Sequence, residues 1–130
     1  MTNIKNICKD VSFNRVYNWN NMPKRILHNV LNSLEIEENK LVLFYDSSVF
    51  ETGKTGIAIC EDGIYWKDMS SPTRFLSWNK FIDMNISKDD YHIYIGDKEG
   101  IFVYHRDLGL LIEMLENLKK DIKANTIVMF

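Results

Sequence analysis

Apolar and polar positions alternate through residues 55–67, which indicates two short strands joined by a tight turn. The apolar positions of these strands are Ile57, Ile59, Ile64 and Trp66. Between them lies Asp62-Gly63, and Asp-Gly between strand-forming residues is a strong hairpin signal. Glycine at position 63 supplies the positive φ that such a turn needs. The sequence therefore predicts a β-hairpin here.

Other short stretches rich in strand-forming residues, the first of them an apolar run, are also predicted to be strands. They are residues 40–45, 74–78, 81–86, 91–95 and 101–104. Loops separate them, including residues 46–55 and the glycine-bounded stretch 96–100. About seven short antiparallel strands at this spacing are typical of a small barrel or sandwich.

Helical periodicity marks both ends of the chain. Residues 23–35 carry one apolar stripe, and residues 3–21 are interpreted as one helix or two short ones. The strongest stripe follows Asp107, a good N-cap residue, and ends near residues 124–125. We expect Leu111, Leu115 and Leu118 of this C-terminal helix to be buried. The apolar residues 127–130 are expected to dock, either on the N-terminal helices or on another chain.

Composition adds limits on function. A chain of 130 residues with a net charge of −2 and a pI of about 5.9 is expected to form one domain. This charge gives no global reason to bind nucleic acid or an anionic membrane. No signal peptide and no membrane span are expected, and two distant cysteines suit a reducing compartment. We therefore expect a cytoplasmic protein.

Candidate chemistry is sparse. The three histidines lie in different predicted elements, so neither a metal site nor a cofactor site is expected. Gly53-Lys54-Thr55 resembles the end of a phosphate-binding loop, but Ser48 stands where that motif has its first glycine, and a strand follows instead of a helix. A Cys60–His92 nucleophile pair stays open as an alternative, because sequence does not show spatial proximity.

Aromatic positions give the candidate binding surface. If the isoleucines of the predicted strands face the core, the intervening side chains share an outer face. The candidate partner-binding residues on that face are Tyr65, Lys67, His92, Tyr94 and Tyr104. Tyrosine is enriched at protein interfaces. The alternative is that the N-terminal helices cover this face and form a second core with it.

A C-terminal helix after about seven antiparallel strands resembles the bacterial pleckstrin-homology-like (PH-like) domains. The resemblance covers residues 40–123, and its local signature is the hairpin at 55–67 followed by Phe75-Leu76-Ser77-Trp78. It implies an α+β, PH-like antiparallel barrel or sandwich. Residues 1–39 would then be an N-terminal helical segment packed on the same domain, and residues 40–130 the PH-like domain with its helix and tail.

The resemblance also implies a function class. PH-like domains mostly present binding surfaces, so we expect a non-enzymatic protein-binding module, of which a bacterial inhibitor or immunity-type protein is one form. Phosphoinositide binding is not expected, because the loop after the first strand offers Lys54 alone. The alternatives are a small enzyme with a pocket hidden from sequence reasoning and a structural subunit of a complex.

Overall fold

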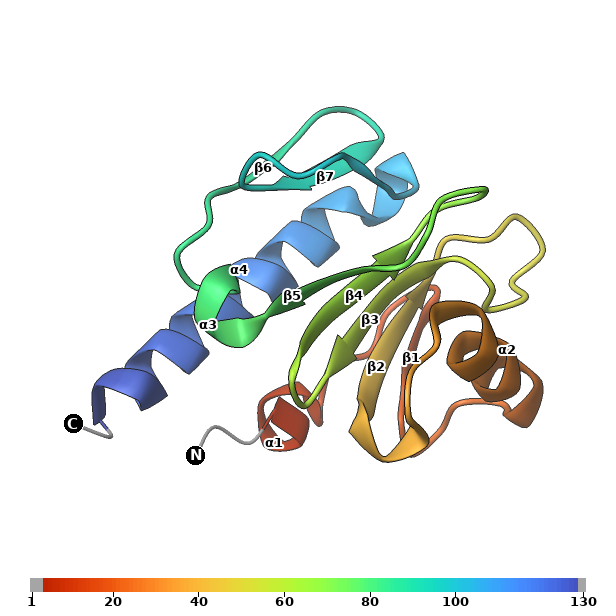
Figure 1. The fold of residues 1–130 in the computed structure, drawn as a ribbon, viewed down its shortest axis with the longest axis horizontal. Helices are drawn as coiled ribbons and strands as arrows, with labels where there is room; N and C mark the ends of the chain where they lie inside the picture. Colours follow the sequence, from red (N-terminus) through yellow and green to blue (C-terminus); the bar gives the residue numbers. More distant parts are fainter. Residues whose placement is uncertain (1–3, 129–130) are drawn as a thin grey trace.

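The chain forms two antiparallel sheets flanked by helices (Figure 1). A computed structural model describes residues 4–128, and it describes side chains as far as residue 125. The elements in chain order are α1 (Ile4–Cys8), β1 (Val16–Asn18), α2 (Lys24–Leu34), the 3-10 turn η1 (Glu38–Lys40), β2 (Leu41–Asp46), β3 (Gly56–Cys60), β4 (Gly63–Lys67), β5 (Arg74–Ser77), α3 (Trp78–Phe81), β6 (Ile86–Lys88), β7 (His92–Ile95), β8 (Ile101–Phe102) and α4 (His105–Val128). The protein is of the α+β class that the sequence predicts.

The larger sheet is a five-stranded meander in the order β1-β2-β3-β4-β5. The hairpin predicted at residues 55–67 is confirmed, because β3 pairs with β4 and Ile59 lies opposite Ile64. β2 pairs with β3 on the other side, with one irregularity between Leu41 and Leu43. β1 and β5 therefore lie at the two edges of this sheet.

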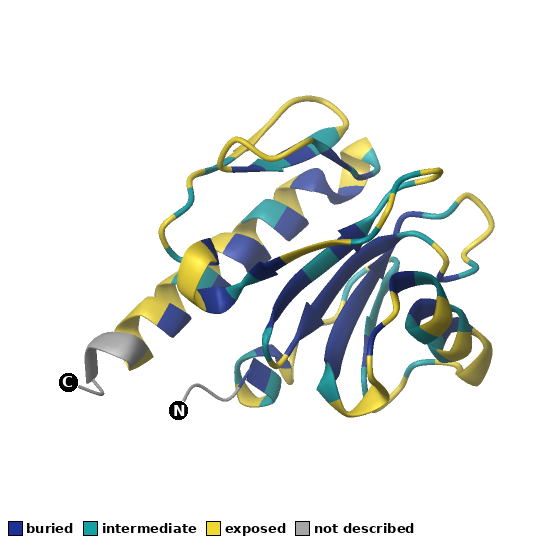
Figure 2. Ribbon diagram, viewed as in Figure 1, coloured by how far each residue is buried: buried dark blue, intermediate teal, exposed yellow. Residues whose placement is uncertain are grey.

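Both faces of the larger sheet are covered. On one face, Phe44, Ala58 and Cys60 pack in a core that includes Ile26 and Val30 of α2. The opposite face contributes Tyr45, Ile57, Ile59, Ile64 and Trp66 to the main core. Figure 2 shows β2 and β3 buried along their whole length. Burial on both faces explains why β2 reads as a continuous apolar run instead of an alternation.

The main core is closed by the smaller sheet and by α4. The smaller sheet has the order β6-β7-β8, and Ile93, Ile95 and Ile101 face inward with no exposed surface. The buried stripe of α4 consists of Leu108, Leu111, Leu115, Leu118 and Ile122, as predicted for its three central leucines. In Figure 1, α4 runs diagonally between the two sheets. Within residues 4–128 no strand pairing joins the sheets, so the arrangement is compatible with a sandwich and is not a closed barrel.

The N-terminal segment contains a strand that the sequence does not predict. The helical interpretation of residues 3–21 is right only for α1 (Ile4–Cys8). β1 pairs with β2, placing Val16 opposite Tyr45, and the Trp19 N–H donates to the Val42 carbonyl at 2.9 Å. A three-residue strand is too short to show a period of two, so pairing with β2 decides its conformation.

The connection between the two sheets also differs from the prediction. The strand predicted at residues 81–86 is wrong, because α3 ends at Phe81 and β6 begins only at Ile86. Trp78 and Phe81 are both buried, and their rings meet edge to face with centroids 5.3 Å apart. The Trp78 indole N–H also donates to the Cys60 carbonyl at 3.0 Å. This turn therefore anchors the chain where it leaves the larger sheet.

Gly63 is required for a different reason from the predicted one. Its φ does not lie in the left-handed region, unlike that of Gly53. A Cβ at position 63 would instead clash with the Leu76 carbonyl oxygen and would lie 2.7 Å from the Phe75 ring. The close approach of β5 to this turn is what excludes a side chain.

The C-terminal helix begins earlier and ends later than the sequence predicts. α4 starts at His105, so Asp107 lies within its first turn and is not the N-cap. It continues to Val128 past the predicted end at 124–125, where neither glycine nor proline interrupts it. The expected docking of residues 127–130 concerns side chains that lie outside the described residues.

Candidate functional site

The β2–β3 loop, residues 47–55, is organised by the buried carboxylate of Asp46. Its Oδ1 accepts hydrogen bonds from the Ser48 N–H at 2.9 Å and the Ser48 hydroxyl at 2.5 Å. Its Oδ2 accepts from the Gly53 N–H at 3.0 Å. In a phosphate-binding loop, a backbone N–H such as that of Gly53 would donate to the phosphate. Here the Gly53 N–H donates to the carboxylate of Asp46 instead. Asp46 holds the loop closed.

Side chains on both sides of this loop fix its position. From β1's side, the Arg15 guanidinium donates to the carbonyls of Asp46 at 3.2 Å and Ser48 at 2.8 Å. From α2, the Asn29 amide donates to the Thr52 carbonyl at 2.7 Å. Hydrogen bonds from Arg15 and Asn29 therefore hold the loop on both sides of its tip.

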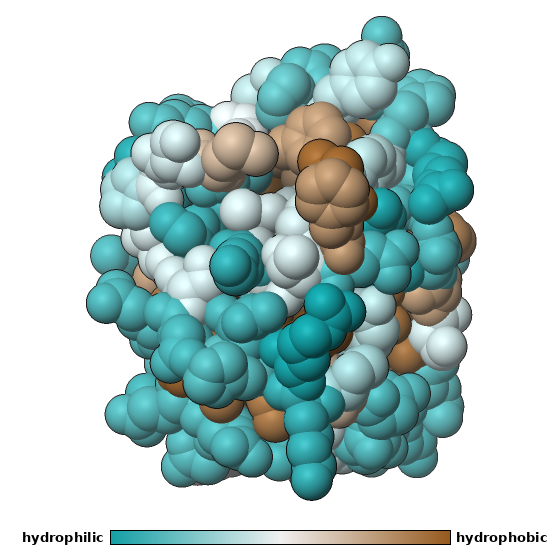
Figure 3. All heavy atoms as spheres, turned by 90° about the vertical axis from the view of Figure 1, so that its right-hand side faces the viewer, coloured by the Kyte–Doolittle hydropathy of each residue, from teal (hydrophilic) through white to brown (hydrophobic). Residues whose placement is uncertain are grey.

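That tip forms an exposed apolar patch with a neighbouring loop. Val49 is 65% exposed, Phe50 83% and Met69, in the β4–β5 loop, 78%. Together with Phe102 of β8 they line a cavity of about 670 Å³. We call Val49, Phe50, Met69 and Phe102 the apolar patch. Figure 3 shows this end of the molecule, where a brown group of hydrophobic side chains stands out from largely hydrophilic surroundings.

Aromatic side chains continue from the patch across the outer face of the smaller sheet. The ring centroids of His92 and Tyr94 are 6.1 Å apart, those of His92 and Phe102 6.3 Å, and those of Phe102 and Tyr104 5.2 Å. We call Tyr94, His92, Phe102 and Tyr104 the aromatic row. Because Phe102 belongs to both groups, the row and the patch form one continuous surface.

The far end of the row is fixed by Asp89. Its carboxylate accepts hydrogen bonds from the Tyr94 hydroxyl at 2.7 Å and from the Tyr91 N–H at 3.0 Å, and His92 Nδ1 lies 3.0 Å away. The Tyr94 hydroxyl, followed by the Tyr91 N–H, lowers the pKa of Asp89 to about 2. The same hydrogen bond raises the pKa of Tyr94. Both groups are thus held in the protonation states that suit this contact.

Three of the five residues predicted to bind a partner therefore lie together, and two lie elsewhere. His92, Tyr94 and Tyr104 belong to the aromatic row. Tyr65 lies on the opposite side of the larger sheet, against the α2 core, and its hydroxyl donates to Asp62 at 3.0 Å. The ammonium group of Lys67 donates to the Ser71 carbonyl. The structure thus divides the predicted face between two sheets.

The apolar patch itself is missed by sequence reasoning, apart from the strand that carries Phe102. Val49-Phe50 sits in a loop that patterning assigns only as a connector, and Met69 is a single apolar residue between Asp68 and Ser70. The usable signal is Val49-Phe50 itself, an apolar pair between Ser48 and Glu51 in a loop where polar residues are the norm.

Asp68 lines the patch cavity and is half-buried. It accepts a hydrogen bond from the Phe102 N–H at 3.3 Å, and burial raises the pKa of its carboxyl. Among the residues that the structure describes, no ion pair joins Asp68 to a basic side chain. The apolar cavity therefore contains one carboxylate that forms no ion pair with a basic side chain in residues 4–125.

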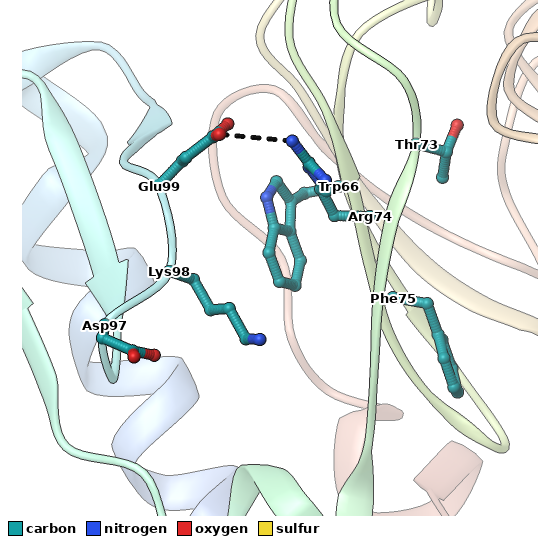
Figure 4. Close-up of a pocket in the computed structure, with 7 residues that line it drawn as sticks. All are labelled: Trp66, Thr73, Arg74, Phe75, Asp97, Lys98 and Glu99. Carbon is teal, nitrogen blue, oxygen red and sulfur yellow. Dashed lines mark hydrogen bonds and ion pairs between the residues drawn. The ribbon is translucent and has the colours of Figure 1, made fainter.

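A second cavity of about 510 Å³ lies between β5 and the β7–β8 loop (Figure 4). Arg74 and Glu99 bridge it with an ion pair of 3.2 Å, and Lys98 extends across it toward β5. Trp66 lies at its back and is almost fully buried. Charged side chains of both signs dominate this cavity, and its main cation and anion already pair with each other.

The described part of the chain forms neither the alternative Cys60–His92 pair nor a metal-binding cluster. Cys60 lies in the α2 core, whereas His92 lies on the outer face of the smaller sheet, so the alternative Cys60–His92 pair is wrong. Burial raises the pKa of Cys8 to about 12 and also raises that of Cys60. Within residues 4–128, no group of three or more His, Cys, Asp or Glu side chains is placed to hold a metal ion. No helix of that part is long and apolar enough to span a membrane.

Comparisons of the chain with protein-family models, with curated proteins and with solved structures find no match. The candidate site is therefore defined by its own geometry: the apolar patch, the aromatic row and the carboxylate of Asp68.

Proposed function

We propose that this protein is a non-enzymatic protein-binding module and that the apolar patch and the aromatic row form its binding surface. The observation that carries the proposal is the exposure of three large apolar side chains around one cavity, at 65% for Val49, 83% for Phe50 and 78% for Met69. Contiguous exposed apolar groups rimmed by polar ones mark interaction sites on otherwise soluble domains.

The energetics favour a partner on this surface. Burying a large apolar side chain contributes about 1.5–3 kcal/mol, and Phe50 and Met69 forgo most of that in the free protein. The loop that carries Phe50 is held by Asp46, Arg15 and Asn29, so a partner need not order it on binding. A surface ordered in advance loses less conformational entropy when it binds.

The order of elements supports a PH-like fold as part of this proposal. The meander of β2 to β5, the second meander of β6 to β8 and a C-terminal helix follow one another as that fold requires. The additions are β1, which extends the first sheet, and α2, which covers its outer face. A PH-like cytoplasmic protein whose surface masks a partner would act as a bacterial inhibitor or immunity-type protein.

A protein partner fits this surface better than an anionic lipid. The apolar cavity contains the carboxylate of Asp68, and Glu51 lies beside the patch, where its carboxylate is 3.8 Å from Arg15. Lys54 also lines the cavity, but a lipid headgroup site wants clustered basic side chains. The net charge of −2 adds no long-range attraction to an anionic surface.

Matched variants test this proposal. We expect Phe50→Ser with Met69→Ser to abolish stoichiometric retention of one partner from a lysate of the producing organism. Leu110→Ser removes a comparable exposed side chain from α4, 49% exposed, and should retain the partner. Equal retention by both variants, or none by the unmodified protein, contradicts the proposal. A different outcome is that the unmodified protein binds phosphatidylserine vesicles and loses that binding in the Phe50→Ser variant. That result would show that the patch binds a membrane and not a protein.

A further inference from the structure

Asp68 lines the cavity of the apolar patch and is half-buried. It precedes Met69 in the β4–β5 loop, and its Oδ1 is joined to the backbone of Phe102 by the hydrogen bond of 3.3 Å. Phe50 lines the same cavity from the β2–β3 loop. A carboxylate is thus combined with two phenyl rings and a thioether around one opening.

The described basic side chains form no ion pair with the carboxylate of Asp68. Burial is the main effect that raises the pKa of Asp68, and the negative charge of Glu99 acts in the same direction. The Phe102 N–H and then His92 lower the pKa of Asp68, and His92 also contacts Asp89 at 3.0 Å. Lys54 lines the cavity as well, yet it is exposed and forms no ion pair with Asp68 within the described residues. A partner's cation would therefore meet a carboxylate that forms no ion pair with any described basic side chain.

The neighbouring surface shows what kind of cation suits it. The Arg15 guanidinium lies 4.3 Å from the centroid of the Tyr104 ring, at the end of the aromatic row. It donates at the same time to the Ser48 carbonyl at 2.8 Å. A guanidinium group can lay its plane on an aromatic ring while its N–H groups donate in that plane, whereas a lysine ammonium is a compact point charge without such a plane. Phe50, Phe102 and Asp68 offer the same combination of rings and oxygen acceptor, and the only hydrogen-bond donor to Asp68 within the described residues is the neutral Phe102 N–H.

We propose that the cavity of the apolar patch receives an arginine side chain from a protein partner. Its aliphatic stem lies against Phe50 and Met69, and its guanidinium binds Asp68 beside the Phe102 ring. This inference rests on the proposed function, since it names the chemistry of the partner at the same surface. A lysine, or a purely apolar side chain, would leave one of these features unused.

Small probes of matched shape test it on the full-length, ¹⁵N-labelled protein. n-Butylguanidinium carries the charge and plane of the arginine head, n-butylurea is its neutral analogue, and n-butylammonium represents lysine. We expect the guanidinium probe to shift the amide resonances of Asp68, Met69 and Phe102. It should bind about fivefold more tightly than the urea, and more tightly than the ammonium probe, as a partly buried ion pair on an aromatic surface predicts.

Asp68→Asn is the decisive variant, because the asparagine keeps an oxygen to accept from the Phe102 N–H and loses only the charge. We expect it to bind the guanidinium and urea probes equally. The control, Glu116→Gln on the exposed face of α4, should leave the preference intact. The inference is overturned if the unmodified protein shows no preference for guanidinium, or if the preference survives in Asp68→Asn.

The same titration separates this inference from the proposed function. If all three probes shift the patch amides equally, the patch binds apolar groups and only the arginine assignment fails. If none of the probes shifts these amides, the arginine assignment and the patch as a binding surface both fail.

Discussion

The hydroxyl of Tyr45 donates a hydrogen bond of 2.8 Å to the carboxylate of Asp107, and both residues are buried. The same hydroxyl accepts from the Tyr104 N–H at 3.1 Å. The pair joins β2 to the first turn of α4 across 62 positions of sequence. An acidic side chain in the first turn also matches the helix dipole. This contact places Tyr104 at the end of the aromatic row, so it links the core to the proposed binding surface.

Removing this hydroxyl should destabilise the protein. We expect Tyr45→Phe to lower the free energy of unfolding by about 1–3 kcal/mol, because it leaves a buried carboxylate with one partner fewer. Tyr17→Phe is the matched control, since its hydroxyl bond to Glu51 is 3.5 Å long and exposed. Urea denaturation measures both. Indistinguishable midpoints for the two variants would contradict the role of the Tyr45–Asp107 pair.

Two glycines should respond in opposite directions to alanine. Gly63→Ala places a methyl group against the Leu76 carbonyl and the Phe75 ring, and we expect a loss of about 1–3 kcal/mol. Gly109→Ala meets nothing within 4 Å on the exposed side of α4, and it should gain about 0.5–1 kcal/mol. Thermal melts of the two variants test the pair. A tolerated Gly63→Ala would show that β5 can move away from this turn.

The C-terminal helix should be integral to the main core. Leu115 has no exposed surface, and we expect Leu115→Ala to cost about 2–5 kcal/mol through lost burial and the cavity left behind. Leu110→Ala, on the exposed side of the same helix, controls for helix propensity and should change stability by less than about 0.5 kcal/mol. Chemical denaturation of both variants checks this. Equal free energies of unfolding for Leu115→Ala and Leu110→Ala would show that α4 does not contribute to the core.

Asp89 should make stability depend on pH in the acidic range. The Tyr94 hydroxyl, chiefly, lowers the pKa of Asp89 from its ordinary 3.8 to about 2. A lowered pKa in the folded state stabilises the protein above the unfolded-state value, and that contribution is lost as pH falls from about 4 to about 2. We expect Asp89→Asn to flatten the fall in the urea midpoint between about pH 5 and about pH 2.5. Glu116→Gln should retain the unmodified slope, and a slope unchanged by Asp89→Asn would contradict the assignment.

Long, locally encoded elements are predictable from this sequence, and short elements determined by tertiary pairing are not. The hairpin of β3 and β4 follows from alternation and the Asp62-Gly63 turn, and α2 and α4 follow from their stripes. β1 has three residues and depends on β2 for its hydrogen bonds. The α3 turn depends on the burial of Trp78 and Phe81. Their sequence pattern predicts strands instead.

The site was predictable only where strand alternation decides which way a side chain faces. Alternation correctly separates His92 and Tyr94 from Ile93. It does not show that the outward faces of β4 and β7 belong to different surfaces, which is why Tyr65 is misgrouped. The exposure of Phe50 depends on how Asp46 folds the β2–β3 loop, a contact that sequence patterning does not encode.

Site-specific photo-cross-linking tests whether a protein partner contacts the apolar patch. A benzophenone amino acid at position 50 reports what touches the patch, and the same group at position 110 is the control on α4. We expect a single cross-linked protein species from position 50 and none from position 110, with the folded state unchanged in both. The absence of a protein adduct at position 50, or the same adducts from both positions, would show that the apolar patch does not bind a protein partner.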